Sequence, residues 1–494
     1  MAEPHIIAGA QRVSDRVAVV DREGAVRFGD LLAASAGTAG ALLDGRSDLE
    51  GAPVVFLVPP GRDHVVWQWG IWRAGGIAVP IAASQAVAEW DYIVADTGAV
   101  TVVSSPEFEA TLRPIAVSRG ARFRLSTAIA GTGASLPDLG DDCAAMILYT
   151  SGTSSRPKGV LTTHANLDAQ IATLVDAWHW TADDRVLHVL PLNHVHGIVN
   201  VLCCALWAGA TCEFLSPFDA ASAWERLASG RFTLFMAVPT IYSKLLAAWD
   251  AADPITRSRW TDGASRLRLT VSGSAALPVA VLNRWRAATG QVLLERYGMT
   301  EIGMALSNPL VGTRRPGSVG TPLPGVEIRL VDDAGVEVAA GTPGEIEVRG
   351  PGVFREYWHR PAATEAAFHD GWFRTGDVAI VEDGSYRILG RLSADIIKTG
   401  GYKVSALEIE EVLREHPAVE ECAVVGVADE DWGERVAAAL VLRPGETLSL
   451  DTLRAWAAPR LATYKLPTRL AITSELPRNA MGKVVKAEVR KRLQ

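Results

Sequence analysis

Cysteine is scarce in this chain. The 494 residues include five cysteines, and none of them forms a CxxC pair or a zinc-ligand spacing: Cys143, Cys203, Cys204, Cys212 and Cys422. The odd number does not suggest a disulfide framework. We expect buried free thiols in a reducing compartment.

Long apolar runs and an excess of basic charge are also missing. The most apolar stretch, residues 198–210, is interrupted by Asn200 and is too short to span a bilayer. Residues 1–5 show no basic region leading into an apolar core, so we expect no signal peptide. The 48 basic and 56 acidic residues give a net charge of -8, which argues against a general nucleic-acid surface. We therefore predict a soluble cytoplasmic protein that has no nucleic-acid or membrane partner.

The first three quarters of the chain alternate between strand-like and helix-like patterns. Residues 54–58 read as a buried strand, 63–73 as a helix, and 77–79 and 100–104 as further strands. Such alternation predicts α/β layers in which helices cover mainly parallel strands. Because the chain is too long for one ordinary core, we expect two or more domains.

The pattern changes twice toward the C-terminus. Short strands at 325–331 and 344–348, bounded by Pro and Gly, predict a β-rich subdomain. After Gly390, Ser405 and Glu408 form a capping-box pattern that opens a helix to about His416. Strands predicted at 424–427 and 436–442 complete a small α+β unit. We therefore predict an N-terminal domain at 1–390, α/β with the β-rich subdomain, and a small mobile C-terminal domain at 391–494.

One segment is rich in small and hydroxyl side chains. Residues 150–159 read TSGTSSRPKG and hold Lys158 between a proline and a glycine. Small residues let backbone N–H groups approach an anion, and the hydroxyls and the lysine add donors and charge. The segment lacks the Walker A pattern, because no second glycine precedes the lysine and no Ser or Thr follows it. It predicts a polyphosphate loop; the alternative is a flexible surface loop.

Further polar motifs follow in order. Residues 295–301, ERYGMTE, offer Tyr297 to stack on a base, Thr300 as a hydroxyl for an α-phosphate and Glu301 as a carboxylate for Mg2+. Asp377 lies on a tight turn and suits ribose hydroxyls. Singly, each has a plain alternative: Glu301 as a helix cap, Asp377 as a turn residue.

Two more motifs lie in the last quarter. Gly390-Arg391, followed by Asp395, Lys398 and Gly400-Gly401, makes a charged junction at the predicted boundary. Residues 477–483, PRNAMGK, end in Lys483. Together the motifs supply what carboxylate activation by ATP requires: phosphate binding, Mg2+, ribose binding and charge neutralisation at the α-phosphate.

These five ordered motifs resemble the adenylate-forming superfamily of acyl-CoA synthetases, adenylation domains and luciferases, from about residue 15 to the C-terminus. The resemblance implies ATP, Mg2+ and CoA. It implies that Lys483 bridges the forming acyl phosphate and the ribose, that Asp377 and Arg391 contact the ribose, and that Glu301 ligates Mg2+. The small domain would rotate about Ser393, and Ser155 stands where the family usually has glycine.

The resemblance carries over two groups of site residues. The catalytic group is Lys483, Glu301, Thr300 and His194. The nucleotide- and CoA-binding group is Thr150, Ser151, Gly152, Thr153, Ser154, Lys158, Gly273, Ser274, Ala275, Glu295, Arg296, Tyr297, Gly298, Asp377, Arg391, Gly400, Gly401 and Lys403.

The expected acid pocket is polar. Its segments contain His194, His196, Lys244 and Ser274, whereas a long-chain acid needs an apolar tunnel. Lys244 lies one and a half turns into a helix that opens at Pro239. Local sequences here are similar to malonyl- and methylmalonyl-CoA synthetases, nearest to the malonate-activating mitochondrial type. The resemblance implies that Ser274 and Lys244 hold the distal carboxylate.

Several alternatives stay open. Bacterial malonate enzymes have an arginine where this chain has Lys244, and lysine keeps the charge but loses the bidentate fork. Arg296 is a second candidate clamp, and Lys244 read plainly is a solvent-exposed helix residue. The chain could activate methylmalonate, a smaller or medium-chain monocarboxylate, or load a carrier protein. A nucleotide-binding scaffold without turnover is disfavoured by the intact Lys483 and Asp377. We expect a monomer or a weak homodimer.

Overall fold

The computed structural model describes residues 3–127, 135–150, 156–400, 402–478 and 484–494. The chain divides into two compact units. The first consists of Met1–Pro316, Gly320–Glu327 and Arg349–Gly371, and the second of Gly317–Val319, Ile328–Val348 and Trp372–Gln494. The domain boundary predicted after residue 390 is a different division of the chain and stays a prediction.

The first unit contains a seven-stranded sheet in the order β18-β8-β7-β4-β3-β5-β6. Strands β7, β4, β3, β5 and β6 are parallel, and β8 and β18 are antiparallel to their neighbours. The strands are β3 (Pro53–Leu57), β4 (Ile77–Pro80), β5 (Thr101–Ser104), β6 (Arg122–Leu125), β7 (Ala144–Thr150), β8 (Lys158–Thr163) and β18 (Glu356–Tyr357).

A nine-stranded sheet in the same unit runs in the order β15-β14-β13-β12-β11-β9-β10-β1-β2. Its central strands, from β13 to β1, are parallel, and the outer pairs are antiparallel. The strands are β1 (Val17–Asp21), β2 (Gly24–Arg27), β9 (Arg185–His188), β10 (Thr211–Phe214), β11 (Leu234–Ala237), β12 (Leu269–Ser272), β13 (Leu294–Met299), β14 (Gly303–Ser307) and β15 (Thr321–Pro322).

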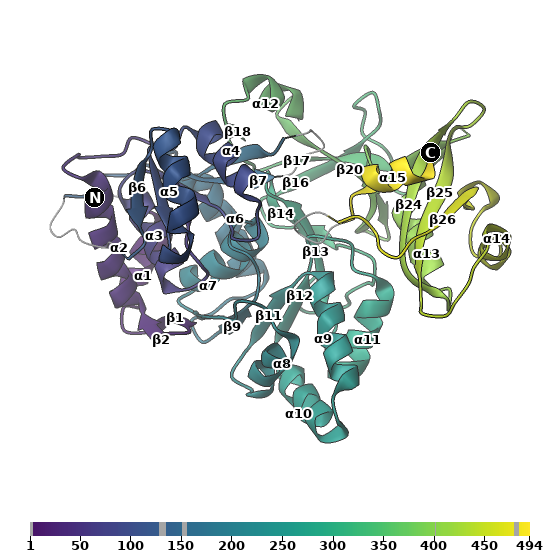
Figure 1. Cartoon of the computed structure of the whole chain (residues 1–494), viewed down its shortest axis with the longest axis horizontal. Coiled ribbons are helices and arrows are strands. Elements are labelled where there is room, and N and C mark those ends of the chain that lie inside the picture. The colour runs from purple at the N-terminus through teal and green to yellow at the C-terminus, as the bar shows by residue number, and fades with distance from the viewer. Residues whose placement is uncertain (1–2, 128–134, 151–155, 401, 479–483) are drawn as a thin grey trace. The chain divides into compact units, whose positions relative to one another are not determined.

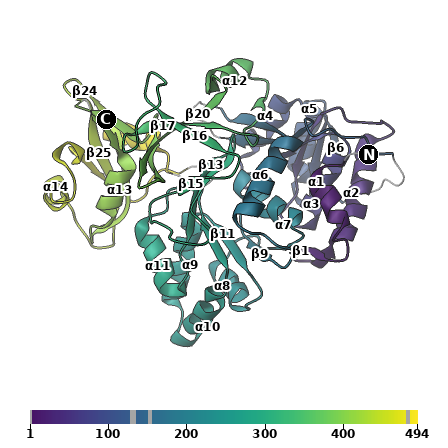
Figure 2. The ribbon, with the colours of Figure 1, turned by 180° about the vertical axis from the view of Figure 1, so that it is seen from behind.

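Helices cover both faces of these sheets (Figures 1 and 2). Strand β3 shows why, because Val54 and Phe56 belong to one core and Val55 and Leu57 to another. Alternating side chains that are all apolar need cover on both faces. The helices of this unit are α1 (His5–Gln11), α2 (Phe28–Leu43), α3 (Arg62–Arg73), α4 (Val87–Thr97), η1 (Pro106–Phe108), α5 (Glu109–Ser118), α6 (His164–Ala177), η2 (His196–Cys203), α7 (Cys204–Trp207), α8 (Ala220–Ala228), α9 (Pro239–Ala251), α10 (Pro254–Ser265), α11 (Val279–Thr289) and α12 (Pro361–Ala367).

The second unit contains two sheets. Strands β16 (Glu327–Val331), β17 (Gly344–Arg349), β20 (Trp372–Glu382) and β21 (Ser385–Arg391) belong to the first. The second has the order β23-β22-β25-β24 with β26 beside β25, and packs α13 and α14 on one face and α15 on the other. Its elements are β22 (Ile396–Thr399), β23 (Tyr402–Ser405), α13 (Ala406–Arg414), β24 (Val419–Asp429), β25 (Gly433–Leu442), α14 (Leu450–Ala457), η3 (Thr463–Lys465), β26 (Arg469–Ile472) and α15 (Lys486–Leu493).

The predicted fold class is confirmed, with one local correction: Cys143 is exposed, whereas the other four cysteines are buried as expected. The helix opened by Ser405 ends at Arg414, close to the expected end at about His416. In the most apolar stretch, residues 198–203 belong to the π-helix η2, which is packed in the core. In the part of the chain that the structure describes, no helix has the length and apolarity needed to cross a membrane.

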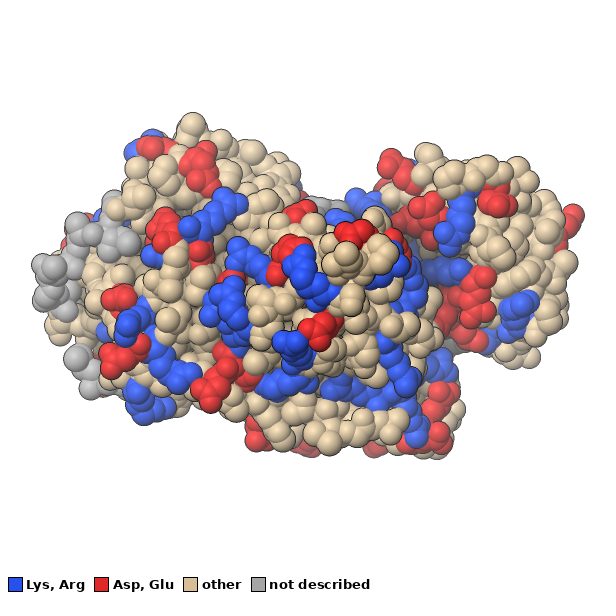
Figure 3. All heavy atoms as spheres, turned by 90° about the horizontal axis from the view of Figure 1, so that it is seen from below, with Lys and Arg blue, Asp and Glu red and all other residues tan. Residues whose placement is uncertain are grey.

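Charges of both signs alternate on the face shown in Figure 3. Arginines of α10 and α11 form ion pairs with carboxylates of neighbouring helices, including Arg259 with Glu225 and Arg284 with Asp250. These exposed pairs offset one another locally and contribute little to stability.

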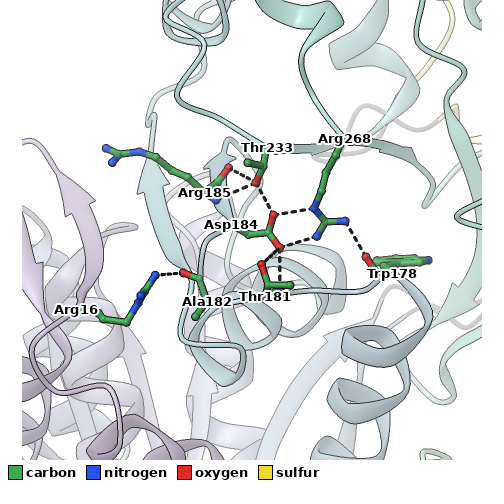
Figure 4. Close-up of polar contacts among 8 residues, drawn as sticks. All are labelled: Arg16, Trp178, Thr181, Ala182, Asp184, Arg185, Thr233 and Arg268. Atoms are coloured by element: carbon green, nitrogen blue, oxygen red, sulfur yellow. Dashed lines mark hydrogen bonds and ion pairs between the residues drawn. The ribbon is translucent and has the colours of Figure 1, made fainter.

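The buried carboxylate of Asp184 links the amino ends of three parallel strands of the nine-stranded sheet, β9, β11 and β12 (Figure 4). Asp184, which is 3% exposed, precedes β9 and accepts hydrogen bonds from the Arg268 guanidinium at 2.7 and 2.6 Å and from the Thr233 hydroxyl at 2.7 Å. Thr233 precedes β11 and Arg268 precedes β12. Burial raises the pKa of Asp184, but the bonds from Arg268 and Thr233 outweigh it, so the pKa lies below its ordinary value.

Substitution Asp184→Asn should lower the free energy of unfolding by about 2–3 kcal/mol at pH 7, because Arg268 loses its counter-charge. A lowered folded-state pKa contributes stability above the unfolded pKa near ~4 and loses it as pH falls through the folded pKa. The difference in the free energy of unfolding between wild type and Asp184→Asn should therefore become smaller below about pH 4, as measured by urea unfolding.

Asp183→Asn is the matched control. The Asp183 side chain is 92% exposed and pairs with Arg16 at 3.1 Å, so its loss should change stability by no more than about 0.5 kcal/mol. Equal effects of the two substitutions would contradict the role of Asp184.

Candidate functional site

Four neighbouring strands of the nine-stranded sheet bring the predicted site residues together. Strands β9, β11, β12 and β13 are parallel, so their carboxyl ends meet at one edge. The segments after them hold His194, the start of α9, Ser274 and Glu301. Crevices at the carboxyl ends of parallel strands are the usual place for ligands in open α/β sheets.

The guanidinium of Arg296 is the most unusual group at this edge. Arg296 lies on β13 and is 4% exposed, and its Nε and Nη2 have no hydrogen-bond partner in the described part of the chain. A Cβ atom on Gly273 would lie 2.5 Å from the Arg296 Cζ, so a side chain at this position would displace the guanidinium. Burial lowers the pKa of Arg296 from 12.5 to about 9, which leaves it charged at neutral pH.

His196 and Ser274 lie next to this charge. The Ser274 hydroxyl and the His196 Nδ1 are 3.1 Å apart, and the Nε2 of His196 is buried with no hydrogen-bond partner among the residues that the structure describes. Burial, and next the charge of Arg296, lowers the pKa of His196 well below its ordinary value, so the ring is neutral. Ser274 has φ of 69°, a left-handed conformation that is uncommon for a non-glycine residue. Backbone strain, beside a buried cation with two nitrogens that lack a partner among the described residues, is typical of a binding site.

The segment that carries His194 is held by a neutral histidine on β9. The His188 Nε2–H donates to the Gly197 carbonyl at 3.0 Å, and the Leu190 N–H donates to Nδ1 at 3.3 Å. Burial lowers the pKa of His188 to about 4, so both roles are kept at neutral pH. His194 itself is half-buried.

A cavity of approximately 780 Å³ adjoins the same segment. It is lined at the carboxyl ends of β3, β4, β5, β9 and β10. Three of its lining atoms are buried without hydrogen-bond partners among the described residues, namely His64 Nε2, Ser105 Oγ and Asn193 Oδ1. These atoms suit a neutral, polar ligand, because a ligand that forms hydrogen bonds with them satisfies buried polar atoms that otherwise lack a partner.

The predicted phosphate residues are partly described. Thr150 ends β7 and faces Lys158 across the β7–β8 pair. The Lys158 Nζ lies 4.8 Å from the centre of the Tyr357 ring, and the Tyr357 hydroxyl donates to the Glu301 carboxylate at 3.0 Å. Glu301 is 5% exposed. Tyr357 thus joins the predicted phosphate-binding lysine to the predicted magnesium ligand.

Asp377 and Arg391 face each other across β20 and β21 in the second unit. The Arg391 Nε and Nη2 donate to the two Asp377 oxygens at 2.8 and 3.1 Å, which is a bidentate pair. Carboxylate oxygens are acceptors that suit the hydroxyl donors of a ribose. The two residues that the sequence predicts at the ribose are therefore in contact.

Other predicted residues have plainer positions or lie outside the described residues. Lys244 is exposed on α9, as are Ala275 and Gly400 in their loops; Glu295 is buried, and Tyr297, Gly298 and Thr300 are half-buried at the end of β13. Residues Ser151, Gly152, Thr153, Ser154, Gly401 and Lys483 lie outside the described residues, and Lys403 is described only by its backbone in β23.

Sequence reasoning missed Tyr357 and His188. Tyr357 comes from a short strand far along the chain from Lys158, and only the pairing of β18 with β8 brings it near. His188 precedes the expected pocket segment directly, so a histidine ending a buried strand was an available signal. Within the described residues, no group of three or more His, Cys, Asp or Glu side chains has metal-binding geometry.

Comparison with protein families agrees with this site. The AMP-binding enzyme family matches residues 8–358, and the AMP-binding enzyme C-terminal domain matches residues 408–483. The chain therefore belongs to the AMP-binding enzyme family, as the resemblance predicted.

Similar proteins span nearly the whole chain. The mitochondrial malonate–CoA ligase ACSF3 of Mus musculus is 47% identical over 97% of this chain and 89% of its own length. The malonate–CoA ligase of Arabidopsis thaliana is 42% identical over 91% of this chain and 79% of its own. The crystal structure of ATP-bound MatB from Rhodopseudomonas palustris has a TM-score of 0.91 at 35% identity, covering 100% of this chain and 99% of the MatB chain.

Replacing the buried guanidinium should not destabilise the protein. We expect Arg296→Met to leave the free energy of unfolding unchanged or to raise it by up to about 2 kcal/mol, because an unpaired buried charge disfavours folding. Arg268→Met, which removes the partner of Asp184, should instead lower it by about 2–3 kcal/mol. Urea unfolding of both variants tests this, and a clear loss of stability in Arg296→Met would show that Arg296 has a counter-charge.

Proposed function

We propose that this chain forms malonyl-CoA from malonate, ATP and CoA through malonyl-adenylate, releasing AMP and pyrophosphate. The observation that carries the proposal is Arg296, which is buried beside Ser274 and His196 and whose Nε and Nη2 find no hydrogen-bond partner among the described residues. Membership in the AMP-binding enzyme family and the similarity to malonate–CoA ligases support it.

Arg296 and Ser274 hold the malonate carboxylate that does not react. A carboxylate supplies the missing counter-charge and accepts from the guanidinium nitrogens, and this restores the hydrogen bonds that burial leaves unmade. His196 is neutral and aligns the Ser274 hydroxyl. Lys244 is exposed, so its charge is screened, and we assign it a secondary role.

The phosphates of ATP bind between Lys158 and Glu301, which Tyr357 connects. Lys158 balances phosphate charge, Thr300 donates to the α-phosphate and Tyr297 stacks on the base. A single buried carboxylate suits Mg2+, which takes one or two carboxylates together with phosphate oxygens and water. Glu301 would hold this ion, and its charge offsets that of the phosphates when it is bound.

The second unit supplies the ribose pair Asp377–Arg391 and Lys483. A malonate oxygen attacks the α-phosphorus and the bond to the β-phosphate breaks, so pyrophosphate leaves while Lys483 offsets the developing charge. Rotation about Ser393 then exchanges Lys483 for the face at Gly400, Gly401 and Lys403. The CoA thiolate attacks the carbonyl and AMP leaves with the former malonate oxygen; the amide-bearing pantetheine arm fits the 780 Å³ cavity.

Finer points stay predictions. Methylmalonate differs by one methyl group, which changes transition-state binding by about 1–3 kcal/mol. The cytoplasmic location predicted above is untested, and the animal relatives are named mitochondrial. The monomer or weak homodimer is also a prediction.

Pyrophosphate release with a panel of acids, with and without CoA, tests the substrate assignment. Wild type should prefer malonate to acetate and octanoate. Arg296→Met should lower kcat/KM for malonate about 100-fold, the equivalent of losing a charge-assisted pair of about 3 kcal/mol. Lys244→Ala should lower it less than tenfold, because exposed charges contribute little.

Other outcomes would revise the proposal in different places. A larger loss in Lys244→Ala than in Arg296→Met would make Lys244 the principal clamp. Preference for a monocarboxylate would leave adenylation intact and overturn malonate. Thioester formation only on a carrier protein would overturn CoA as the acceptor.

Lys483→Ala should separate the two half-reactions. We expect malonyl-adenylate formation to fall at least about 100-fold, because the charge at the α-phosphate is no longer offset. Thioester formation from supplied malonyl-adenylate and CoA should stay within about threefold of wild type. Near-normal adenylate formation in the variant would exclude this role for Lys483.

A further inference from the structure

Lys486 lies at the centre of an ion-pair cluster in the second unit. Its Nζ is 2.5 Å from the Asp395 carboxylate and 2.7 Å from the Glu410 carboxylate. The Lys486 side chain is 12% exposed and that of Glu410 4%. Three elements meet here, since Asp395 precedes β22, Glu410 lies on α13 and Lys486 begins α15.

The cluster is balanced in charge, because Lys486 and Arg414 face Asp395 and Glu410. Glu410 also accepts from the Arg414 guanidinium at 2.9 Å and from the Val424 backbone N–H at 2.8 Å. Burial alone would lower the pKa of Lys486, but the charges of Glu410 and Asp395 outweigh it and the pKa is raised. A buried ammonium with two carboxylates stays charged, and removing it leaves both carboxylates short of a partner.

Asp395 connects this cluster to Arg391. One Asp395 oxygen pairs with Lys486, and the other accepts the Arg391 backbone N–H at 3.0 Å. The Asp395 backbone N–H donates back to the Arg391 carbonyl at 2.7 Å. Gly390 makes the fold possible, because it has φ of 128° and its Cβ would lie 2.4 Å from the Asp395 Cβ.

The connection continues to Asp377. The Arg391 side chain is held by Asp377 in the bidentate pair, while its backbone is held by Asp395. The intervening Ser393 is exposed, so the segment gains little order from packing on its own. Ion pairs and a hydrogen bond thus form a continuous path from Lys486 through Asp395 to the Asp377–Arg391 pair.

We propose that Lys486 is a positioning residue for ATP: through Asp395, it fixes the backbone of Arg391 and so preorganises the Asp377–Arg391 pair for the ribose. The inference rests on the proposed function, in which this pair contacts the ribose. Lys486 does not touch the nucleotide; it lowers the ordering that binding would otherwise require.

Equilibrium binding of ATP to the full-length chain tests this, together with kinetics of malonate-dependent pyrophosphate release. Lys486→Met should raise the Kd and KM for ATP about tenfold while kcat changes less than about threefold. Asp395→Asn should act in the same direction. Lys486→Arg keeps the charge and should restore most of the affinity.

Lys465→Met is the matched control. Lys465 forms an ion pair of 2.6 Å with Glu408 in the same unit and is not a member of the Asp395–Glu410 cluster. It should leave the Kd for ATP within about twofold of wild type. Equal effects on ATP affinity in Lys465→Met and Lys486→Met would mean a general loss of structure and would overturn the inference.

A double-substitution cycle separates positioning from packing. Lys486→Met should weaken ATP binding much less in an Arg391→Met background, because the pathway is already broken. Additive effects would overturn the inference. If Arg391→Met and Asp377→Ala themselves leave ATP binding unchanged, the ribose assignment fails; if they weaken it and Lys486→Met does not, only the positioning role fails.

Discussion

A buried guanidinium is the main constraint on the candidate site of the first unit, because the described residues supply no hydrogen-bond partner for its Nε and Nη2. Arg296 stays charged at neutral pH, although burial opposes its charge. Gly273 gives it room, and the neighbouring His196 is neutral. The buried charge therefore lowers the stability of the folded chain, and an anion that binds beside it would compensate for this loss.

Contacts at the amino ends of the neighbouring parallel strands help the fold to tolerate the buried charge of Arg296. Asp184, Thr233 and Arg268 satisfy one another at the amino ends of β9, β11 and β12. Paired charges stabilise the amino ends, whereas the candidate binding residues lie after the carboxyl ends. Parallel strands make this separation possible, because all of them point their carboxyl ends to one edge.

Much of this organisation could be predicted from the sequence. Apolar runs such as residues 54–58 predict strands buried on both faces, and Pro239 at the first turn of α9 predicts its start. The direction of a side chain was harder to predict. Helical spacing placed Lys244 in the pocket segment but did not show that it is exposed. The link between Asp395 and Lys486 joins residues far apart in the chain, and no local pattern reports such a contact.

The contrast between Arg296 and Lys244 bears on selectivity for a dicarboxylate. An exposed cation is screened by water and salt, so it attracts acids of every kind and discriminates weakly among them. A buried guanidinium behaves differently. A monocarboxylate removes water from the site but has no second carboxylate to pair with the guanidinium, so the charge is left without water and without a partner. Sites built to pair a substrate group reject analogues that lack it by ~10⁴ or more. Under the proposed function, the selectivity for malonate therefore resides mainly in Arg296, and exposed Lys244 contributes mainly to the rate of encounter.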